Sequence, residues 1–326
     1  MSIRVWELSA RIPRRKERLR YAARIWLCWP WVAPLLRLLA GSPLEPLLRR
    51  DPMILHRARR PYLSSSWSRA RRLQAVVGHY RFVMQHLGTA FVVPVYLRDG
   101  LFLAGLDKSE RGYELFLSYE PRFGNEGEIT LSLRRRADRR RLCSLTFTID
   151  PSGPGGLALR IGCIHADNGA DTLELIRDFT RDYHGMRPKA LLLWASRQLA
   201  DRLGAHSVMG IRDSRHVYQH GHYARSYGGH VRCSYEELWL EAGGSAYGDW
   251  IEMSATTPPR EPGDIPARKR ARYARRYHWL NAMATDLRRS IDAVTPRIAP
   301  AYGTAAGGFD PAPADHTPDS PVHPAW

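Results

Sequence analysis

The chain has 326 residues, of which 44% are hydrophobic, enough to form a substantial core and to exclude disorder throughout. It carries 49 Lys and Arg against 32 Asp and Glu, a formal net charge of +17 at pH 7. This balance favours acidic partners such as phosphates, anionic lipids or acidic saccharides, although arginines on solvated surfaces explain it equally well. The four cysteines include no Cys-x-x-Cys pair, which argues against disulfide and thiolate zinc frameworks and fits a reducing cytosol.

Residues 1–60 are predicted to form a basic, Trp-rich N-terminal arm and linker. A basic stretch precedes the apolar run 25–36, which has the outline of a signal peptide, but Pro30 and Pro34 interrupt it and no convincing cleavage site follows. The run is shorter than the roughly 20 residues that a spanning helix needs, so no transmembrane segment is expected. Two alternatives stay open: an arm packed on the domain, or tryptophans and arginines lying on an anionic membrane surface.

The hydrophobic pattern of the next segment predicts one long helix followed by strands. Ser64–Ser66 offer an N-cap for an amphipathic helix over 67–87. From Val92 the period changes to two, and neighbouring runs with short connections should pair antiparallel. The arginines at 134–136 and 139–141 flank a hairpin tip, where they can grip phosphate or keep an exposed edge soluble. The strand-like runs are 101–106, 113–119, 129–133 and 142–149.

The stretch 157–244 is predicted as strand, helix pair and strand, with the second helix starting at Pro188 and the second strand over 207–211. The fold class is therefore α+β: one domain over 61–295 with a mainly antiparallel sheet covered by helices. A disordered tail over 296–326 follows, because Ala, Gly, Pro and Asp dominate there. The remaining predicted elements are a helix over 234–242, a strand over 250–254 and a helix over 268–291.

An antiparallel meander that continues into strand, helix and strand is similar to the general topology of the N-acetyltransferase-like superfamily, by fold-level analogy. That likeness implies an Arg-containing, Gly-rich turn that holds the pyrophosphate of acyl-CoA at a helix N-terminus. The corresponding turn, Ala166–Asp171, has one glycine, no arginine and two carboxylates that repel a pyrophosphate. We therefore expect the shape without the acyl-CoA site, and no cofactor is predicted.

Polar residues after the two buried strands make a candidate site, because strand ends of open α/β sheets bind ligands. If the strands are neighbours, one cleft gathers an acid, a base and cations for acid–base chemistry or for clamping an anion. An alternative for 184–189 is a connector in which Gly185 ends one helix and Pro188 starts the next. The candidate catalytic residues are His165, Asp167, His184 and His216; the candidate ligand-binding residues are Arg187, Lys189, Arg212, Asp213, Tyr235 and Trp239.

Two further patterns in the sequence have both a functional and a simpler structural explanation. The densest histidine group can bind a divalent metal, but Gly221 and the lack of a fixed carboxylate partner favour polar-loop or structural histidines, so no metal is predicted. The basic segment 268–276 contains tyrosines and is compatible with nucleic acid or anionic lipid, but no recognised reader module accompanies it. Nucleic acid is therefore ranked below an anionic ligand or lipid surface. The histidines are His206, His216, His220, His222 and His230.

Five motifs follow one another along the chain: Ile161-Gly162, His184–Lys189, Arg212–His216, Tyr235–Gly244 and Lys269–Tyr277. In this order they resemble the VirK/YbjX family of bacterial proteins over roughly Pro61 to Ile291. The resemblance implies an accessory protein in envelope remodelling, virulence and tolerance of cationic antimicrobial peptides, cytoplasmic or at the inner face of the membrane, and implies no established reaction. An acyltransferase-like enzyme is the first alternative and a nucleic-acid or anionic-lipid binding protein the second.

Overall fold

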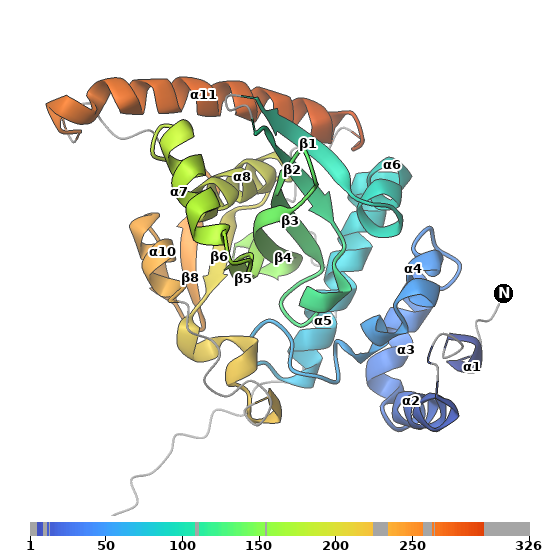
Figure 1. Cartoon of the computed structure of the whole chain (residues 1–326). Helices are drawn as coiled ribbons and strands as arrows, with labels where there is room; N and C mark the ends of the chain where they lie inside the picture. Colours follow the sequence, from blue (N-terminus) through green and yellow to red (C-terminus); the bar gives the residue numbers. More distant parts are fainter. Residues whose placement is uncertain are drawn as a thin grey trace, which may run out of the picture.

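The computed structural model describes residues 5–8, 12, 14–107, 111–153, 155–223, 234–256, 263 and 265–296. The predicted disordered tail beyond residue 296, together with His230 and Cys233, lies outside the described residues. In the described part an eight-stranded sheet has the order β1-β2-β3-β4-β5-β6-β8-β7, with helices packed around it (Figure 1). The strands are β1 Leu101–Leu106, β2 Tyr113–Ser118, β3 Ile129–Arg135, β4 Arg141–Gly153, β5 Gly156–Ala166, β6 Ser207–Ile211, β7 Ser245–Tyr247 and β8 Trp250–Ser254.

The sheet is antiparallel except where β5 pairs with β6, so the predicted α+β fold with a mainly antiparallel sheet is confirmed. The parallel pair is joined by a crossover through two helices, α7 (Thr172–Asp182) and α8 (Pro188–Arg202), as a parallel connection requires. Its last register pair is Ile161 with Gly210, whereas β5 continues to Ala166 and β6 ends at Ile211. The end of β5 therefore extends beyond the last β5–β6 pair, and the candidate site forms at this opening.

Two local expectations were wrong. The long helix does not start at Ser64–Ser66: the cap of α5 is Ser68, whose Oγ accepts a hydrogen bond from the Arg71 N–H at 3.2 Å. The segment Val92–Leu97, which was placed where the period of two begins, is helical. The elements between the N-terminus and β1 are α1 Val5–Leu8, α2 Arg15–Leu27, α3 Trp29–Leu39, α4 Glu45–Arg50, η2 Pro52–His56, α5 Arg69–Phe82, η3 Val83–Leu87, α6 Gly88–Val92 and η4 Val93–Leu97.

The N-terminal helices share the core of the domain. Tyr21 and Ile25 of α2, and Val32 of α3, belong to the same buried cluster as the residues of the sheet. The Tyr21 hydroxyl also donates a hydrogen bond to the Pro52 carbonyl at 2.9 Å. This arrangement corresponds to the alternative in which the N-terminal arm packs on the domain. The later helices are η5 Pro121–Phe123, η6 Asp213–Arg215, η7 Val217–Gln219, α10 Glu236–Glu241 and α11 Ala267–Asp292.

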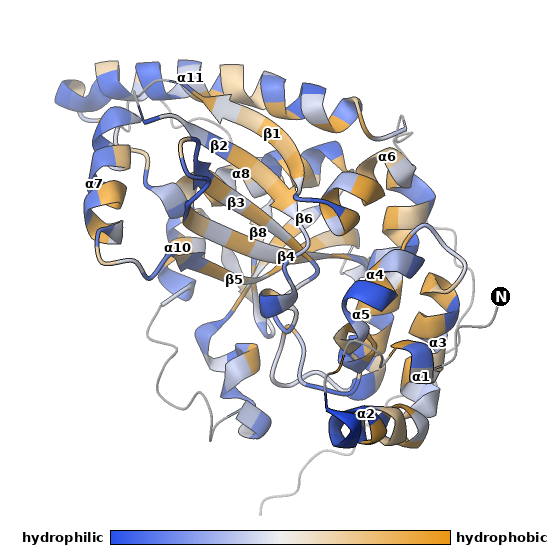
Figure 2. Ribbon diagram, turned by 45° about the vertical axis from the view of Figure 1, so that its right-hand side comes forward, coloured by the Kyte–Doolittle hydropathy of each residue, from blue (hydrophilic) through white to orange (hydrophobic). Residues whose placement is uncertain are grey.

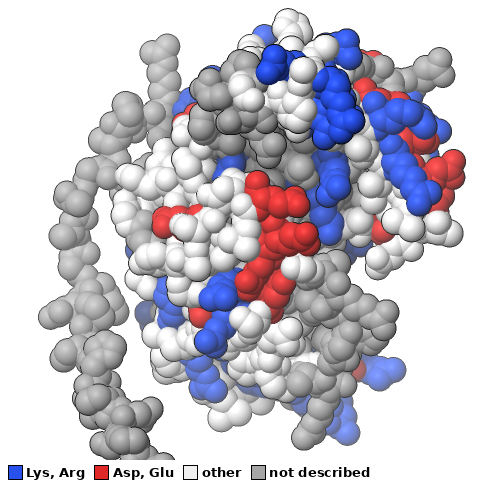
Figure 3. All heavy atoms as spheres, turned by 90° about the vertical axis from the view of Figure 1, so that its left-hand side faces the viewer, with Lys and Arg blue, Asp and Glu red and all other residues white. Residues whose placement is uncertain are grey.

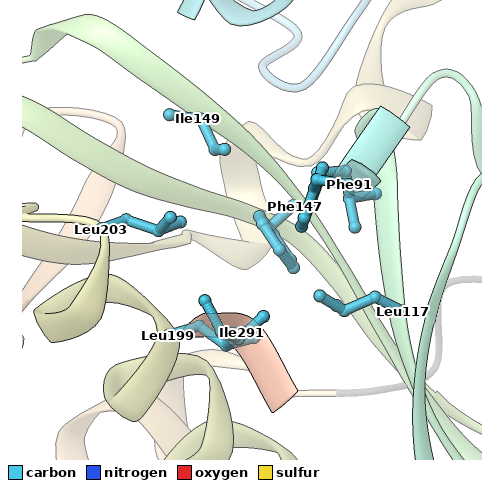
Figure 4. A pocket seen from close by; sticks show the side chains of 8 residues that line it. Phe91, Leu117, Phe147, Ile149, Leu199, Leu203 and Ile291 are labelled. Atoms are coloured by element: carbon cyan, nitrogen blue, oxygen red, sulfur yellow. The ribbon is translucent and has the colours of Figure 1, made fainter. Parts of the chain in front are cut away.

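Apolar residues concentrate on the strands and on the helix faces turned towards them (Figure 2). Between the sheet and helices α6, α8 and α11 lies a gap of about 10 Å³, lined by apolar side chains such as Phe147, Leu199 and Ile291 (Figure 4). A gap of this size without polar groups holds neither an ordered water nor a ligand. We therefore regard it as a packing gap in the core.

Candidate functional site

The candidate site is built on the loop between η5 and β3, where Glu126 is 1% exposed. A Cβ added to Gly162 of β5 would lie 2.0 Å from the Glu126 carbonyl oxygen, so the loop reaches β5 because this position carries no side chain. Gly127, with a φ of +152°, also passes close to a neighbouring strand, since a Cβ added there would lie 2.8 Å from the backbone of Phe147. The Ile161-Gly162 motif thus has a physical reason: it lets the loop insert a glutamate beside the end of β5.

The Glu126 carboxylate faces two histidines that come from different elements. Its Oε1 lies 3.2 Å from Nε2 of His165, at the end of β5, and 3.3 Å from Nε2 of His216, which follows η6. The side chain of His216 is 1% exposed, whereas that of His165 is 34% exposed. The other ring nitrogen of His165 lies 3.3 Å from the hydroxyl of Tyr235, just before α10. One buried carboxylate therefore connects a sealed histidine with a half-exposed one.

The pKa of Glu126 is set by two opposing effects. Burial raises it, but the hydrogen bond with His165 and the electrostatic attraction of both His165 and His216 outweigh burial and lower the pKa to about 2. Glu126 is therefore ionised at neutral pH. His216 Nδ1 accepts the Tyr218 N–H at 3.4 Å, so the proton of a neutral imidazole sits on Nε2, towards Glu126 but off the direction of a good hydrogen bond.

Glu126, Cys163 and His165 lie close enough for one cation, because their ligand atoms are within 4.8 Å of one another. Two observations favour proton transfer over metal binding. Burial raises the pKa of the Cys163 thiol well above its ordinary value, so a cation would have to displace the thiol proton, which lowers its affinity. The backbone N–H on Nδ1 of His216 keeps the proton on Nε2, the nitrogen that would otherwise complete the ligand set.

The exposed side of His165 has an aromatic and cationic border. The Phe123 ring stacks on His165 with centroids 5.8 Å apart. The guanidinium carbons of Arg122 and Arg141 lie 4.6 and 5.9 Å from the Phe123 centroid. Arg141 pairs through Nη2 with Glu120 at 2.8 Å, whereas its buried Nε and Nη1 have no hydrogen-bond partner among the described residues. This border can hold an anionic group beside His165.

Four other predicted site residues position the cluster or lie beside it. The Asp213 carboxylate accepts the Tyr235 N–H at 2.7 Å, and the Trp239 indole donates to the Ile211 carbonyl at 3.0 Å. Arg212 pairs with Glu236 of α10 at 3.2 Å. These contacts fix α10 to the end of β6, and with it Tyr235. Asp167 instead pairs with Arg140 in the turn after β5.

His184, Arg187 and Lys189 lie at the connection between α7 and α8. This connection is separated from the turn after β5 by the whole of α7, 11 residues, or about 16 Å of helix. Gly185 has a φ of +75°, Pro188 begins α8, and the His184 carbonyl accepts hydrogen bonds from Arg276 of α11. The structure thus brings together His165, His216 and Tyr235 and places the 184–189 segment at the far end of α7.

Glu126 and the border formed by Phe123, Arg122 and Arg141 were missed by the sequence analysis. Glu126 precedes a strand within Gly124-Asn-Glu-Gly-Glu128, and glycines alternating with glutamates are a usable signal of a tightly packed polar loop. What the pattern does not contain is the partner: the histidines are 39 and 90 positions further along the chain, at His165 and His216.

These features define a class: an α+β protein with a histidine–carboxylate cluster where a parallel strand pair opens in an otherwise antiparallel sheet. The chain belongs to the family described as "Protein of unknown function (DUF535)", whose model matches residues 11–289. The "Uncharacterized protein YbjX" of Escherichia coli K12 is 29% identical over 243 residues, covering 74% of this chain and 72% of the relative. The resemblance to the VirK/YbjX family is thereby confirmed.

Two further relatives extend the comparison. An "Uncharacterized protein" of Haemophilus influenzae is 24% identical over 273 residues, covering 83% of this chain and 89% of the relative. The "Membrane protein LapB" of Mannheimia haemolytica is 28% identical over 199 residues, covering 60% of this chain and 82% of the relative. No solved structure matches. Within the described residues, none of the helices combines the length and apolar character needed to cross a membrane.

Proposed function

We propose that the protein is an enzyme that moves a proton at His165 while acting on an anionic component of the bacterial envelope. The observation that carries the proposal is the Glu126 carboxylate, which is buried, ionised and in contact with one sealed and one half-exposed histidine. Titratable groups of this kind, held by a buried partner and reachable from solvent, are typical of catalytic sites.

The roles of the residues follow from the two sides of the His165 ring. The Nε2–H of His165 donates to the Glu126 carboxylate, whose negative charge orients the ring and stabilises its protonated form. Nδ1 faces the hydroxyl of the buried Tyr235, which can donate a proton to the ring or accept one from it. His216 fixes the carboxylate from the buried side. His165 is the group proposed to contact the substrate, because its side chain is 34% exposed whereas Tyr235 is 1% exposed.

The substrate class follows from charge. Arg122 and Arg141 lie against Phe123, the ring that stacks on His165, and favour a phosphate or carboxylate there. A protein with a net charge of +17 does not sequester cationic peptides by attraction, so tolerance of such peptides is better explained by action on anionic lipid or lipopolysaccharide precursors. The family resemblance supports the envelope role, and a cytoplasmic or inner-face location belongs to the same proposal.

Acyl transfer is the second candidate, because the β5–β6 parallel pair within an antiparallel sheet is the topology that the N-acetyltransferase analogy anticipates. The turn that would hold a pyrophosphate is occupied by the chain itself. The Arg140 guanidinium lies against Gly169 and pairs with both Asp167 and Asp171. Acyl-CoA binding would have to displace Arg140, so we rank this reaction second.

Nucleic-acid binding is ranked third. On the face shown in Figure 3, acidic and basic side chains lie next to one another, and the surface is not uniformly basic. On α7, for example, Arg181 pairs with Asp178 at 2.7 Å. A nucleic-acid binder would show an affinity that falls steeply with salt, and this measurement distinguishes it from the other two classes.

The proposal is tested in cells that lack the gene. Wild-type protein should restore envelope lipid composition and resistance to a cationic peptide, His165→Gln should fail because glutamine does not titrate, and the exposed His206→Gln should succeed. Metal-chelator treatment of the purified protein should not change its melting temperature. If His165→Gln restores both phenotypes at wild-type protein levels, the cluster is not catalytic; if the deletion has no phenotype, the envelope role is wrong.

A binding measurement locates the anion. The melting temperature is compared with lipid A precursors, phosphosugars, acetyl-CoA and short oligonucleotides, since a ligand at about a hundred times its Kd stabilises the fold by roughly 2.7 kcal/mol. Arg141→Met should abolish the shift given by the binding anion, and the exposed Arg187→Ala should leave it intact. The reverse outcome would place the anion at the α7–α8 connection, where the sequence predicted Arg187 and Lys189.

A further inference from the structure

The outward face of α2 carries an apolar stripe that the core does not use. Tyr21 and Ile25 are buried on the inner side of the helix. On the opposite side Leu19, Trp26 and Leu27 are 56%, 64% and 83% exposed. Their spacings of seven and eight residues bring them onto one face of a helix with 3.6 residues per turn. Apolar side chains gathered in this way mark an interaction surface, whereas scattered ones do not.

Basic residues border this stripe, and their arrangement identifies what covers it. Lys16, Arg20 and Arg24 recur every four residues along one edge, and all three are exposed. The acidic residue of the helix, Glu17, lies 3.7 Å from Arg14 just before the helix. A second copy of the chain would oppose these cations to one another, and like charges repel. An apolar stripe with a cationic edge instead complements a surface that is apolar below and anionic above.

We propose that α2 is a membrane-surface helix that docks the domain on an anionic phospholipid bilayer. Trp26 and Leu27 insert at the level of the head groups and upper acyl chains, and Lys16, Arg20 and Arg24 contact lipid phosphates. The Trp26 ring is stacked on Trp29 at 5.2 Å, so the next helix continues the aromatic surface. α2 lies at the periphery of the molecule, where a flat surface can reach it (Figure 1).

The attachment of α2 to the domain makes this docking directional. The Tyr21 hydroxyl donates to the Pro52 carbonyl at 2.9 Å, and the Tyr21 ring meets His56 edge-on at 5.1 Å. Because the inner face of α2 is part of the core, the helix does not need to detach in order to bind, and the bound domain keeps one orientation. This inference is independent of the proposed catalytic site.

The test is flotation of the full chain with vesicles. Vesicles of phosphatidylcholine containing about a third phosphatidylglycerol should carry the wild-type protein at low salt, neutral phosphatidylcholine vesicles should carry much less, and high salt should release it. Trp26→Ser combined with Leu27→Ser should weaken partitioning by about tenfold or more, since both side chains lose their apolar insertion. Arg20→Gln and Arg24→Gln should each weaken it by about fivefold.

The matched control is Leu173→Ser combined with Leu240→Ser, two leucines that are 69% and 52% exposed on α7 and α10. This control should float like the wild type, and all variants should keep the wild-type melting temperature because every altered side chain is exposed. The proposal is overturned if the wild type does not float with anionic vesicles or if the control loses binding equally. It is also overturned if the purified chain is a dimer that Trp26→Ser and Leu27→Ser dissociate, since the stripe would then be covered by a second copy.

Discussion

Glu126 and Glu128 are two residues apart in one loop, and both are 1% exposed, yet they face different surroundings. Glu126 meets His165 and His216, and its pKa is lowered to about 2. Glu128 lies 3.4 Å from Nε of Arg57 and accepts the Tyr80 hydroxyl at 2.6 Å, and its pKa is raised because burial outweighs these partners. Two equally buried glutamates therefore have pKa values shifted in opposite directions, because their partners differ.

The difference lies in what the partners can do. Arg57 is 7% exposed, does not titrate in the physiological range, and also approaches Asp51 at 3.7 Å. It ties the segment after η2 to the sheet through Glu128. The partner of Glu126, His165, is an imidazole whose side chain is a third exposed. A sealed cluster with fixed charges holds the fold together, whereas an open cluster with titratable groups is suited to chemistry.

The largest expected effect comes from breaking the sealed cluster. Arg57→Met leaves Glu128 as a buried carboxylate without its cation and should lower the free energy of unfolding by about 3–5 kcal/mol. Urea denaturation measures the loss. The control is Arg49→Met, which removes a surface ion pair with Glu45 and should cost less than about 1 kcal/mol. Similar losses for both variants would show that the Glu128 cluster does not stabilise the fold.

The second prediction concerns the contact that places the loop. Gly162→Ala brings a methyl group against the Glu126 carbonyl oxygen, a backbone atom that moves only with the loop. We expect a loss of about 3 kcal/mol, at the upper end for overpacking, together with loss of the anion response at His165. Gly221→Ala is the matched control, because nothing lies within 4 Å of its added Cβ. A Gly162→Ala variant with native stability would contradict the role assigned to this glycine.

Local patterns in the sequence predicted some elements of the fold correctly, but not the features that depend on distant contacts. Alternating apolar residues predicted β6 over Ser207–Ile211 and β8 over Trp250–Ser254 with correct ends, because strand periodicity is local. The cap at Ser64 was misplaced because its hydroxyl donates to Asp249 at 2.8 Å, a contact across 185 positions. Glu126 was missed for the same reason: its importance depends on a loop and a strand that meet only in the folded chain.

The third prediction concerns how the free energy of unfolding depends on pH. Burial lowers the pKa of His79 to about 3, and its Nε2 lies 2.8 Å from the Tyr96 hydroxyl in the sealed region. In the unfolded chain His79 binds a proton near pH 6.5, whereas in the folded chain it does so only near pH 3. The free energy of unfolding therefore falls as the pH drops from about 6.5 towards 3. At pH 5 the loss from His79 should be about 2 kcal/mol. His56, whose pKa burial also lowers to about 3, adds a similar loss to the difference between urea titrations at pH 7 and pH 5.

His79→Gln provides the comparison, because it removes this titration. The loss between pH 7 and pH 5 should be smaller in the variant by the same amount, whatever its stability at pH 7. Glu126 does not contribute in this range: its pKa is lowered to about 2, so its stabilisation is complete above about pH 4.5 and is lost only below that value. An unchanged pH dependence in His79→Gln would show that His79 is protonated in the folded protein.

The smallest expected effect concerns the open cluster. His165→Gln should change the free energy of unfolding by less than about 1 kcal/mol, because the side chain is 34% exposed and glutamine can still donate to Glu126. The same variant should abolish function, and this separation of stability from function is what the comparison between Glu126 and Glu128 predicts. Urea denaturation of His165→Gln beside wild type decides it. A loss above about 2 kcal/mol would make His165 a structural partner like Arg57, and the two glutamates would then serve the same purpose.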